Sequence, residues 1–434
     1  MNTIKLVVIG GGSSYTPELV EGVINNYNTL PVRELIFVDV PMGEEKVRIN
    51  TQFIKRMIHK AKLNIEVSYT FDRKNALKDA DFVMTQLRVG GLKARSKDEH
   101  IPLKYNVIGQ ETTGPGGFAK ALRTIPVMMD ICKDMEEVCP DAWLINFTNP
   151  SGIVTEALNK YTKIKNIGLC NVPIGMHYDI AERLEVDPKE ISCNVIGLNH
   201  LSFVNKVYYK GDNVISKALE VKKKDGIVQN ISKIDVSDFI AQKLGLVLSP
   251  YLQYFFFEKE MLEKELQELK DDKGTRADQV QEVEHKLFEL YEDESLDHKP
   301  EELSKRGGAR YSEAAINLIN SIYNNVGDIQ VVNVMNNGSI ADLPDDASVE
   351  VNCVINKQGA TPVTNGHLPL AVKGLVQHVK AYEQLTVEAA ITGDYDTALL
   401  ALISNPLVHD AEAAKNILDD LLEAHKEYLP QFNK

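Results

Sequence analysis

The strongest fold signal in this chain is the segment Lys5-Leu-Val-Val-Ile-Gly10-Gly-Gly-Ser-Ser-Tyr-Thr-Pro17. Its first half is a short apolar run that predicts a buried strand, and a helical pattern follows its second half. Between a strand and a helix, a first glycine permits a tight turn, a later one lets the backbone approach a phosphate, and the helix N-terminus offers free N–H groups. The stretch therefore predicts a dinucleotide-binding loop that consists of Gly10, Gly12, Ser13 and Ser14.

The next apolar run, Glu34-Leu-Ile-Phe-Val-Asp39, ends in an acidic residue. A carboxylate at the end of the second strand suits hydrogen bonds from an adenosine ribose, and it would repel a 2′-phosphate, so Asp39 favours NAD over NADP. The loop departs from the full fingerprint because Tyr15 stands where a third glycine is expected. A structural glycine turn in a protein without a cofactor is therefore the alternative interpretation.

Outward from this loop, short β-branched runs alternate with helical stretches as far as Ile164–Leu169, which is typical of a parallel, doubly wound sheet. Later segments alternate like antiparallel strands, namely Phe203–Tyr209, Gly327–Asn333 and Ala347–Ile355. A Glu/Lys-rich segment over 258–294 predicts solvent-exposed helices with a break near Asp271. The predicted fold class is α/β, with a Rossmann-type NAD-binding domain over 1–170. A larger mixed α/β domain over 171–434 would hold the substrate, the metal and the oligomer contacts.

Composition narrows the function classes. The 434 residues carry 48 Lys+Arg against 62 Asp+Glu, a formal net charge of −14, and the sequence pI is near 5.3. This balance argues against nucleic acid or an acidic membrane surface as the main partner. An anionic ligand would need a local basic pocket inside this acidic protein.

Cysteine usage indicates the compartment. Five cysteines in 434 residues are too few for a disulfide framework, so we expect a reducing environment. The first ten residues lack the long apolar core of a signal peptide, and no run of about eighteen apolar residues occurs. We therefore expect a cytoplasmic protein without a membrane span.

A thiol and an imidazole follow at two strand ends. Gly168-Leu-Cys170-Asn-Val-Pro173 places Cys170 just after an apolar strand, where ligands bind in an open α/β sheet. Gly197-Leu-Asn-His200-Leu-Ser-Phe203 places His200 at the start of a later strand. Each could be purely structural, a buried small hydrophobe or a hydrogen-bonded histidine. If they converge, they suit a divalent transition metal with open positions for substrate oxygens.

Several polar segments are rich in glycine, amides and cations: Leu87–Arg95, Ile108–Gly117, Asn146–Gly152 and Lys305–Gly308. Arginine beside glycine suits bidentate binding of phosphate or carboxylate, although each segment alone could be a surface loop. The aromatic stretch Ser249–Phe257 predicts a core or subunit-contact helix. Its Tyr251 could act as a base only if a nearby cation lowered its pKa.

These segments, in this order, resemble glycoside hydrolase family four, the NAD- and metal-dependent glycosidases, and within it the enzymes that cleave 6-phospho-β-glucosides. The matching motifs run from the first strand to the second domain: GGGSSYTP at 10–17, GQETTGPGG at 109–117, NFTNPSG at 146–152, GLCNVP at 168–173, GLNHLSF at 197–203 and KRGG at 305–308. The resemblance implies NAD and a divalent metal, usually manganese, as cofactors, and a phosphorylated sugar as substrate.

The resemblance also implies roles for single residues. Cys170 and His200 match the metal ligands, Tyr251 the catalytic base, and Glu111 an acidic position that raises the basicity of that tyrosine. The implied substrate-binding residues are Arg95, Asn149, Asn171, Arg306 and Arg88. Members that cleave α-glycosides have an aspartate next to the metal cysteine, whereas this chain has Asn171. A β-linkage is therefore expected, with no obvious side-chain acid.

The implied mechanism differs from that of the usual carboxylate pair. NAD⁺ accepts a hydride from C3 of the phosphorylated glucose unit, the metal polarises the oxygens at C2 and C3, and Tyr251 removes the C2 proton. The aglycone then leaves by elimination, water adds, and the hydride returns to C3. The alternatives are a 6-phospho-α-glucosidase of the same family, an NAD-dependent 2-hydroxy-acid dehydrogenase and an NAD-binding redox sensor. A homodimer or homotetramer is expected.

Overall fold

The computed structural model describes residues 3–221, 237–306 and 310–432. Its centre is a nine-stranded sheet in the order β13-β12-β11-β6-β5-β4-β1-β2-β3. Six strands, all parallel, reproduce the 3-2-1-4-5-6 order of a dinucleotide-binding sheet. They are β3 (Glu66–Thr70), β2 (Val32–Val38), β1 (Ile4–Ile9), β4 (Phe82–Thr85), β5 (Trp143–Asn146) and β6 (Lys165–Gly168). The predicted Rossmann-type sheet is confirmed.

Three strands from late in the chain extend this sheet: β11 (Asp328–Met335), β12 (Ser348–Asn356) and β13 (Gly359–Pro362). β11 pairs with β6 in antiparallel fashion where Asn333 faces Gly168, and β12 and β13 follow as antiparallel neighbours. The alternating patterns read as antiparallel strands are thus confirmed. The division of the chain after residue 170 stays a prediction, since strands from both sides of that point share one sheet.

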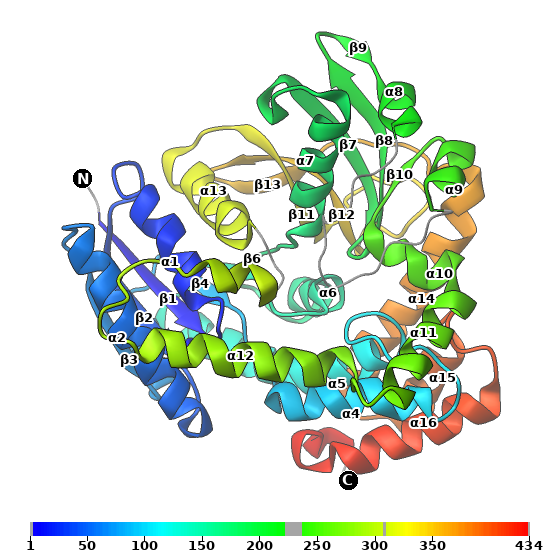
Figure 1. Ribbon diagram of the computed structural model, residues 1–434, viewed down its shortest axis with the longest axis horizontal. Helices are drawn as coiled ribbons and strands as arrows, with labels where there is room; N and C mark the ends of the chain where they lie inside the picture. Colours follow the sequence, from blue (N-terminus) through cyan, green and yellow to red (C-terminus); the bar gives the residue numbers. More distant parts are fainter. Residues whose placement is uncertain (1–2, 222–236, 307–309, 433–434) are drawn as a thin grey trace.

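Helices surround the sheet because each buries an apolar face against it or against another helix (Figure 1). The N-terminal half contributes α1 (Thr16–Asn25), α2 (Glu44–Lys60), α3 (Arg73–Leu77), α4 (Gly91–Leu103), α5 (Gly114–Val138), α6 (Ser151–Tyr161) and α7 (Val172–Leu184). The later chain contributes α13 (Tyr311–Asn324), α14 (Leu370–Thr392), α15 (Tyr395–Ile403) and α16 (Ala411–Ala424). Short 3₁₀ helices are η1 (Pro41–Gly43), η2 (Pro188–Glu190), η3 (Pro250–Leu252), η4 (Glu301–Arg306), η5 (Lys426–Tyr428) and η6 (Pro430–Phe432).

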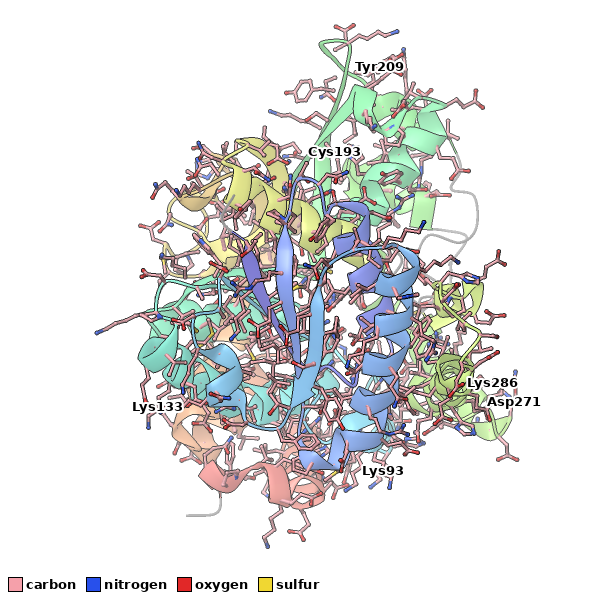
Figure 2. The ribbon with its side chains drawn as sticks, turned by 90° about the vertical axis from the view of Figure 1, so that its left-hand side faces the viewer. Lys93, Lys133, Cys193, Tyr209, Asp271 and Lys286 are labelled. Atoms are coloured by element: carbon pink, nitrogen blue, oxygen red, sulfur yellow. The ribbon has the colours of Figure 1, made fainter. Side chains whose placement is uncertain are left out.

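A smaller antiparallel layer projects from this body, with Tyr209 near its far end and Cys193 closer to the body (Figure 2). It contains β7 (Ile191–Leu198), β8 (Leu201–Tyr209), β9 (Asp212–Asn213) and β10 (Val247–Leu248), flanked by α8 (Ile215–Glu220) and α9 (Ser237–Leu244). The β7–β8 turn lies at the end nearest the main sheet, and it carries His200 in a left-handed conformation with φ of 64°.

The charged segment over 258–294 forms α11 (Glu258–Lys270) and α12 (Arg276–Glu292), preceded by the short α10 (Gln253–Phe256). The expected break lies at 271–275, so the helices and their interruption are confirmed. In Figure 1, α12 runs across the front of the molecule between α11 and α2. Among the described helices, none is both long and apolar enough to span a bilayer.

One expectation needs correction. The four glycines of Ile108–Gly117 are typical of a loop, but Gly114–Gly117 form the first turn of α5. Pro115 suits a helix start, since its missing N–H would be unsatisfied there in any case. A Cβ on Gly116 would lie 2.2 Å from the backbone oxygen of Gln110, so the glycines let the preceding loop fold back against the helix.

Candidate active site

The glycine loop joins β1 to α1 at the carboxyl edge of the sheet. Gly10 has φ of 91°, and a Cβ there would lie 2.9 Å from the backbone of Leu87, two residues after the end of β4. The amide of Gly12 donates to Asp39 Oδ2 at 2.6 Å, which ties the loop to the end of β2. Burial raises the pKa of Asp39, although the Gly12 and Val40 amides oppose the shift. This Cβ-free cradle fits a dinucleotide phosphate, with Asp39 at the ribose end.

Helix α12 packs over this loop, a contact that the sequence did not reveal. The Ser13 hydroxyl accepts from the Tyr15 amide at 3.3 Å, within the turn itself. Ser14 is buried, and its hydroxyl lies 3.4 Å from Glu284 of α12. The hydroxyl of Tyr291, on the same helix, donates to the Ser14 carbonyl at 3.0 Å. The predicted cofactor loop is therefore covered by a segment far away in sequence.

Cys170 and His200 lie in one buried region. Cys170 lies two residues after the end of β6, and the backbone amides at the start of α7 and the Asn199 side chain face its thiol. Burial and the nearby Glu350 nevertheless raise the pKa of the Cys170 thiol. Burial lowers the pKa of His200 to about 3, so its imidazole is neutral at physiological pH. A neutral imidazole is the form that binds metals.

Tyr251 joins the two residues. Its ring stacks on the imidazole of His200 with centroids 3.8 Å apart, and it packs against the cluster of buried residues that contains Cys170. Burial raises the pKa of Tyr251, the Cys170 and Glu111 charges raise it further, and Thr112 and Arg95 oppose the shift. Without an added cation the phenol stays protonated at neutral pH, so a basic Tyr251 needs a bound metal ion beside it.

Glu111 is the centre of a charged cluster. Arg88 forms a hydrogen-bonded ion pair with one of its carboxylate oxygens. Arg95 contacts the other at 3.0 Å, and Lys120 lies 3.1 Å from the first. Burial alone would raise the pKa of Glu111, but the three cations hold it well below its usual range. Glu111 is therefore ionised, and it influences Tyr251 as a fixed negative charge.

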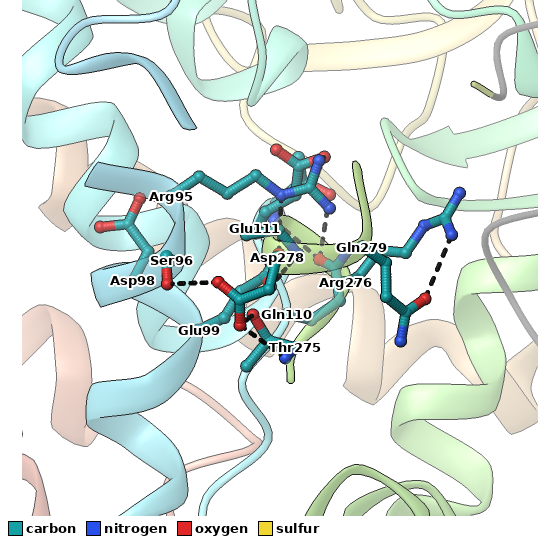
Figure 3. Close-up of polar contacts among 12 residues, drawn as sticks. Arg95, Ser96, Asp98, Glu99, Gln110, Glu111, Thr275, Arg276, Asp278 and Gln279 are labelled. Atoms are coloured by element: carbon teal, nitrogen blue, oxygen red, sulfur yellow. Dashed lines mark hydrogen bonds and ion pairs between the residues drawn. The ribbon is translucent and has the colours of Figure 1, made fainter. Parts of the chain in front are cut away.

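Arg95, which lies on α4, contacts a second carboxylate in addition to that of Glu111. Its Nε donates to Glu99 Oε1 at 2.7 Å, and the other oxygen of Glu99 accepts from the Ala277 amide at the start of α12. Figure 3 shows Arg95 and Glu111 beside the start of α12, where Asp278 accepts from Ser96 at 2.9 Å. The cluster thus fastens α12 to α4 next to the site.

Lys120 is a site residue that the sequence analysis missed. It lies in α5, it is buried, and burial together with the charge of Arg88 lowers its pKa to about 7. Nothing local distinguishes it from the solvent-facing lysines of an amphipathic helix. Its position one turn after the Gly114–Gly117 segment is the only available signal.

Among the remaining predicted site residues, Asn149 and Asn171 lie just after strands, whereas Arg306 lies at the end of a 3₁₀ helix. Asn149 follows β5, precedes a cis proline, and its buried Oδ1 has no hydrogen-bond partner among the described residues. Asn171 caps α7 directly after Cys170. Arg306 ends η4, and its side chain lies outside the described part of the structure.

The donor set fits a metal ion that completes its coordination with ligands from outside the chain. Among the described residues, no three His, Cys, Asp or Glu side chains gather in a metal-binding arrangement. Cys170 and His200 would supply one sulfur and one nitrogen, and the orphaned Asn149 oxygen indicates room for a polar ligand. Two protein ligands leave positions open for substrate oxygens.

Comparison with known proteins defines the class. The sequence model of Family 4 glycosyl hydrolase matches residues 5–186, and that of the Family 4 glycosyl hydrolase C-terminal domain matches 195–408. A probable 6-phospho-beta-glucosidase of Bacillus subtilis is 55% identical over 99% of this chain and 98% of its own. A 6-phospho-beta-glucosidase of Escherichia coli is 45% identical over 99% and 97%.

A solved structure agrees. The 6-phospho-beta glucosidase from Thermotoga maritima, determined with manganese, NAD⁺ and glucose-6-phosphate, superimposes with a TM-score of 0.87 at 38% identity, covering 98% of this chain and 99% of the other. The chain belongs to glycosyl hydrolase family 4. The predicted family is confirmed, and the dehydrogenase and redox-sensor alternatives are set aside.

Proposed function

We propose that this protein hydrolyses 6-phospho-β-glucosides with the help of NAD and a divalent metal, Mn²⁺ foremost. One observation carries the proposal: a neutral histidine stacked on a tyrosine, beside a buried cysteine, in a chain of this family. The arrangement places a metal-binding nitrogen and a proton-accepting oxygen on neighbouring rings. This pair of rings could remove a proton from a carbon whose oxygen is bound to the metal.

Each residue has a proposed part. Cys170 and His200 hold the metal, and Gly10, Gly12, Ser13, Ser14 and Asp39 hold the dinucleotide. When bound, NAD⁺ supplies a reversible hydride acceptor for C3, and the metal a Lewis acid for the oxygens at C2 and C3. Tyr251 removes the proton from C2, and Glu111 increases the basicity of its phenolate through its fixed charge.

The sugar phosphate needs local positive charge in an acidic protein. Arg88, Arg95 and Lys120 share the carboxylates Glu111 and Glu99, which leaves one cation in excess when Lys120 is protonated. We assign Arg88, Arg95 and Arg306 to the substrate, together with Asn149, whose buried oxygen can accept from a sugar hydroxyl. Arg95 is buried between two carboxylates, so its part is to orient rather than to attract.

The linkage preference rests on Asn171. An amide next to Cys170 has no acidic proton to give to a leaving oxygen. The absence of a side-chain acid at this position accords with the β-glycosides that these two similar enzymes are named for. We further propose a homodimer or homotetramer. A cytoplasmic location accords with all five cysteines being buried and unpaired.

A chromogenic 6-phospho-β-glucoside tests the proposal when incubated with the protein, NAD⁺, Mn²⁺ and a thiol reductant. We expect hydrolysis without net accumulation of NADH, and loss of activity when the metal is chelated. Stoichiometric NADH release would instead indicate a dehydrogenase. Turnover confined to the matched 6-phospho-α-glucoside would overturn the β assignment.

A further inference from the structure

The glutamate at position 350 has no part in the reaction described above, although it is among the most buried charged side chains. Glu350 lies in β12 with 1% of its surface exposed. No lysine, arginine or histidine in the described ranges forms an ion pair with it, in contrast to Glu156, which contacts Lys380 at 2.6 Å. A buried carboxylate without a cation is costly, so the fold must hold it by hydrogen bonds.

Those hydrogen bonds lead to both candidate metal ligands. Asn199 donates to Glu350 Oε1 at 2.9 Å and Ser202 donates to Oε2 at 2.8 Å, so the two carboxylate oxygens hold the residues on either side of His200. This turn has left-handed backbone at His200, a conformation that needs support from its surroundings. Glu350 therefore fixes the direction in which the imidazole points.

The same carboxylate reaches the cysteine strand. Asn333 lies opposite Glu350 in the β11–β12 ladder and donates to Oε1 at 3.4 Å, while its backbone pairs with Gly168 of β6, two residues before Cys170. The Asn199 side chain, held by Glu350, also faces the thiol of Cys170. One carboxylate thus connects the two segments that bring sulfur and nitrogen together.

We propose that Glu350 is a positioning residue for the metal site, whose carboxylate holds the turn of His200 and the strand end of Cys170 in register. The inference rests on the proposed role of those two residues as metal ligands. Partners that orient metal ligands typically account for about 10- to 100-fold in metal affinity. Within the part of the chain that the structure describes, no hydrogen bond joins Glu350 to Cys170 or His200, so it would act on them through Asn199, Ser202 and Asn333.

The test is Mn²⁺ binding by the full-length chain with NAD present, followed by the electron paramagnetic resonance signal of free Mn²⁺. Titrations at pH 8 keep the carboxylate ionised, since burial raises the pKa of Glu350 to about 7. Glu350→Gln keeps the shape but turns one acceptor into a donor that faces other donors. We expect its Kd for Mn²⁺ to rise about 10- to 100-fold, with NAD affinity unchanged within twofold.

Glu156→Gln is the matched control, because it removes an equally buried carboxylate that holds Lys380 and the Ser348 amide instead. It should lower thermal stability without changing the Kd for Mn²⁺. A Glu350→Gln protein that binds Mn²⁺ as the wild type does would overturn the inference.

Ser202→Ala, which removes one hydrogen bond to Glu350, is the variant to test if Glu350→Gln fails to fold. It should weaken Mn²⁺ binding by a smaller factor. In that case, Mn²⁺ affinity equal to wild type in Ser202→Ala would also overturn the inference.

Two further variants separate this inference from the proposed function. Cys170→Ser and His200→Ala should abolish Mn²⁺ binding at the concentrations used. If both still bind the ion, the proposed metal site itself has failed. If both lose it while Glu350→Gln binds normally, the metal site stands and only the positioning role of Glu350 is rejected.

Discussion

The imidazole of His200 and the phenol of Tyr251 lie face to face, with ring centroids 3.8 Å apart and planes within 4° of parallel. A shift of one ring therefore moves the other. Because His200 is a proposed metal ligand and Tyr251 the proposed base, this stack holds the ligand ring and the base ring side by side. Because His200 is neutral, it adds no positive charge beside the phenol, so a metal ion held there would lower the pKa of Tyr251 beyond the effect of Arg95.

Tyr251→Phe should preserve this stack and remove only the phenol oxygen. We expect kcat to fall by about 10²- to 10⁴-fold, as for loss of a general base, while Mn²⁺ and NAD affinities stay within a few fold. Product formed in D₂O by the wild type should carry deuterium at C2. Tyr251→Phe should slow this incorporation by the same factor as it lowers kcat. Tyr254→Phe, a buried neighbour, is the control and should keep its activity. Wild-type kcat in Tyr251→Phe would exclude it as the base.

Lys120→Met should change the pH dependence of activity. Lys120 is one of the cations that hold the pKa of Glu111 low, so its removal raises that pKa and the acidic limb of kcat/KM moves to higher pH. A hydrogen bond between charged groups contributes about 1.5–3 kcal/mol, so kcat/KM at neutral pH should fall roughly tenfold or more. Lys133→Met, an exposed change on the same helix, should alter neither the acidic limb nor kcat/KM at neutral pH. An unshifted acidic limb in Lys120→Met would contradict the role assigned to Glu111.

Asp39→Asn should weaken NAD binding and relax the choice of cofactor. The carboxylate accepts from the Gly12 amide at 2.6 Å and from the Val40 amide at 2.8 Å, and an asparagine offers only one oxygen for these two donors. We expect about a tenfold higher Kd for NAD, with NADP losing less because the repelling charge is gone. Fluorescence titration with both cofactors measures this. Equal losses for the two would argue against Asp39 facing the ribose.

Asp98→Asn tests the stability of the buried core around the cluster. Arg123 binds both oxygens of Asp98 at 2.7 Å, and His425 Nε2 lies 2.8 Å away, all fully buried. Leaving Arg123 unpaired should cost about 3–5 kcal/mol of unfolding free energy, measured by urea with the single Trp143 as probe. Asp297→Asn, which breaks an exposed pair with Lys60, should cost less than about 1 kcal/mol.

The pH dependence of that difference has a definite sign. Burial would raise the pKa of Asp98, but Arg123 and His425 lower it below its usual value. Its contribution to stability is therefore complete above the unfolded pKa of about 3.9 and is lost as pH falls through the folded pKa. The gap between wild type and Asp98→Asn should stay constant from pH 6 to 8 and narrow in acid. A gap that narrows toward pH 8 would contradict this assignment.

Much of the fold could be predicted because local patterns encode it. Three local patterns predict a parallel sheet that binds ligands at its carboxyl edge: the glycine loop, the acidic end of β2 and the strand before Cys170. The break in the charged helices was visible in the residues around Asp271. The helical start at Gly114 was misjudged because glycines are common in loops, whereas here they allow backbone contact.

The rest of the site depends on packing between distant segments. Lys120 resembles any helix lysine until α5 buries it against Glu111. Glu350 did leave a trace, a charge inside the apolar run Val349–Val351, yet only the hairpin turn and β11 reveal what it holds. Nothing in the local sequence predicts that Glu284 and Tyr291 cover the glycine loop, since both lie on a helix whose charged pattern is typical of a solvent-exposed surface.

The junction of β6 and β11 has a consequence for engineering. Because the sheet is completed by strands that the ribosome makes last, a fragment ending after β6 would present an open edge to solvent, where other chains can add as extra strands. The N-terminal half, which carries the glycine loop, is therefore not a unit that can be transferred on its own to another protein. Domain exchange among relatives would therefore have to include β11–β13, so that β6 keeps β11 as its neighbour in the sheet.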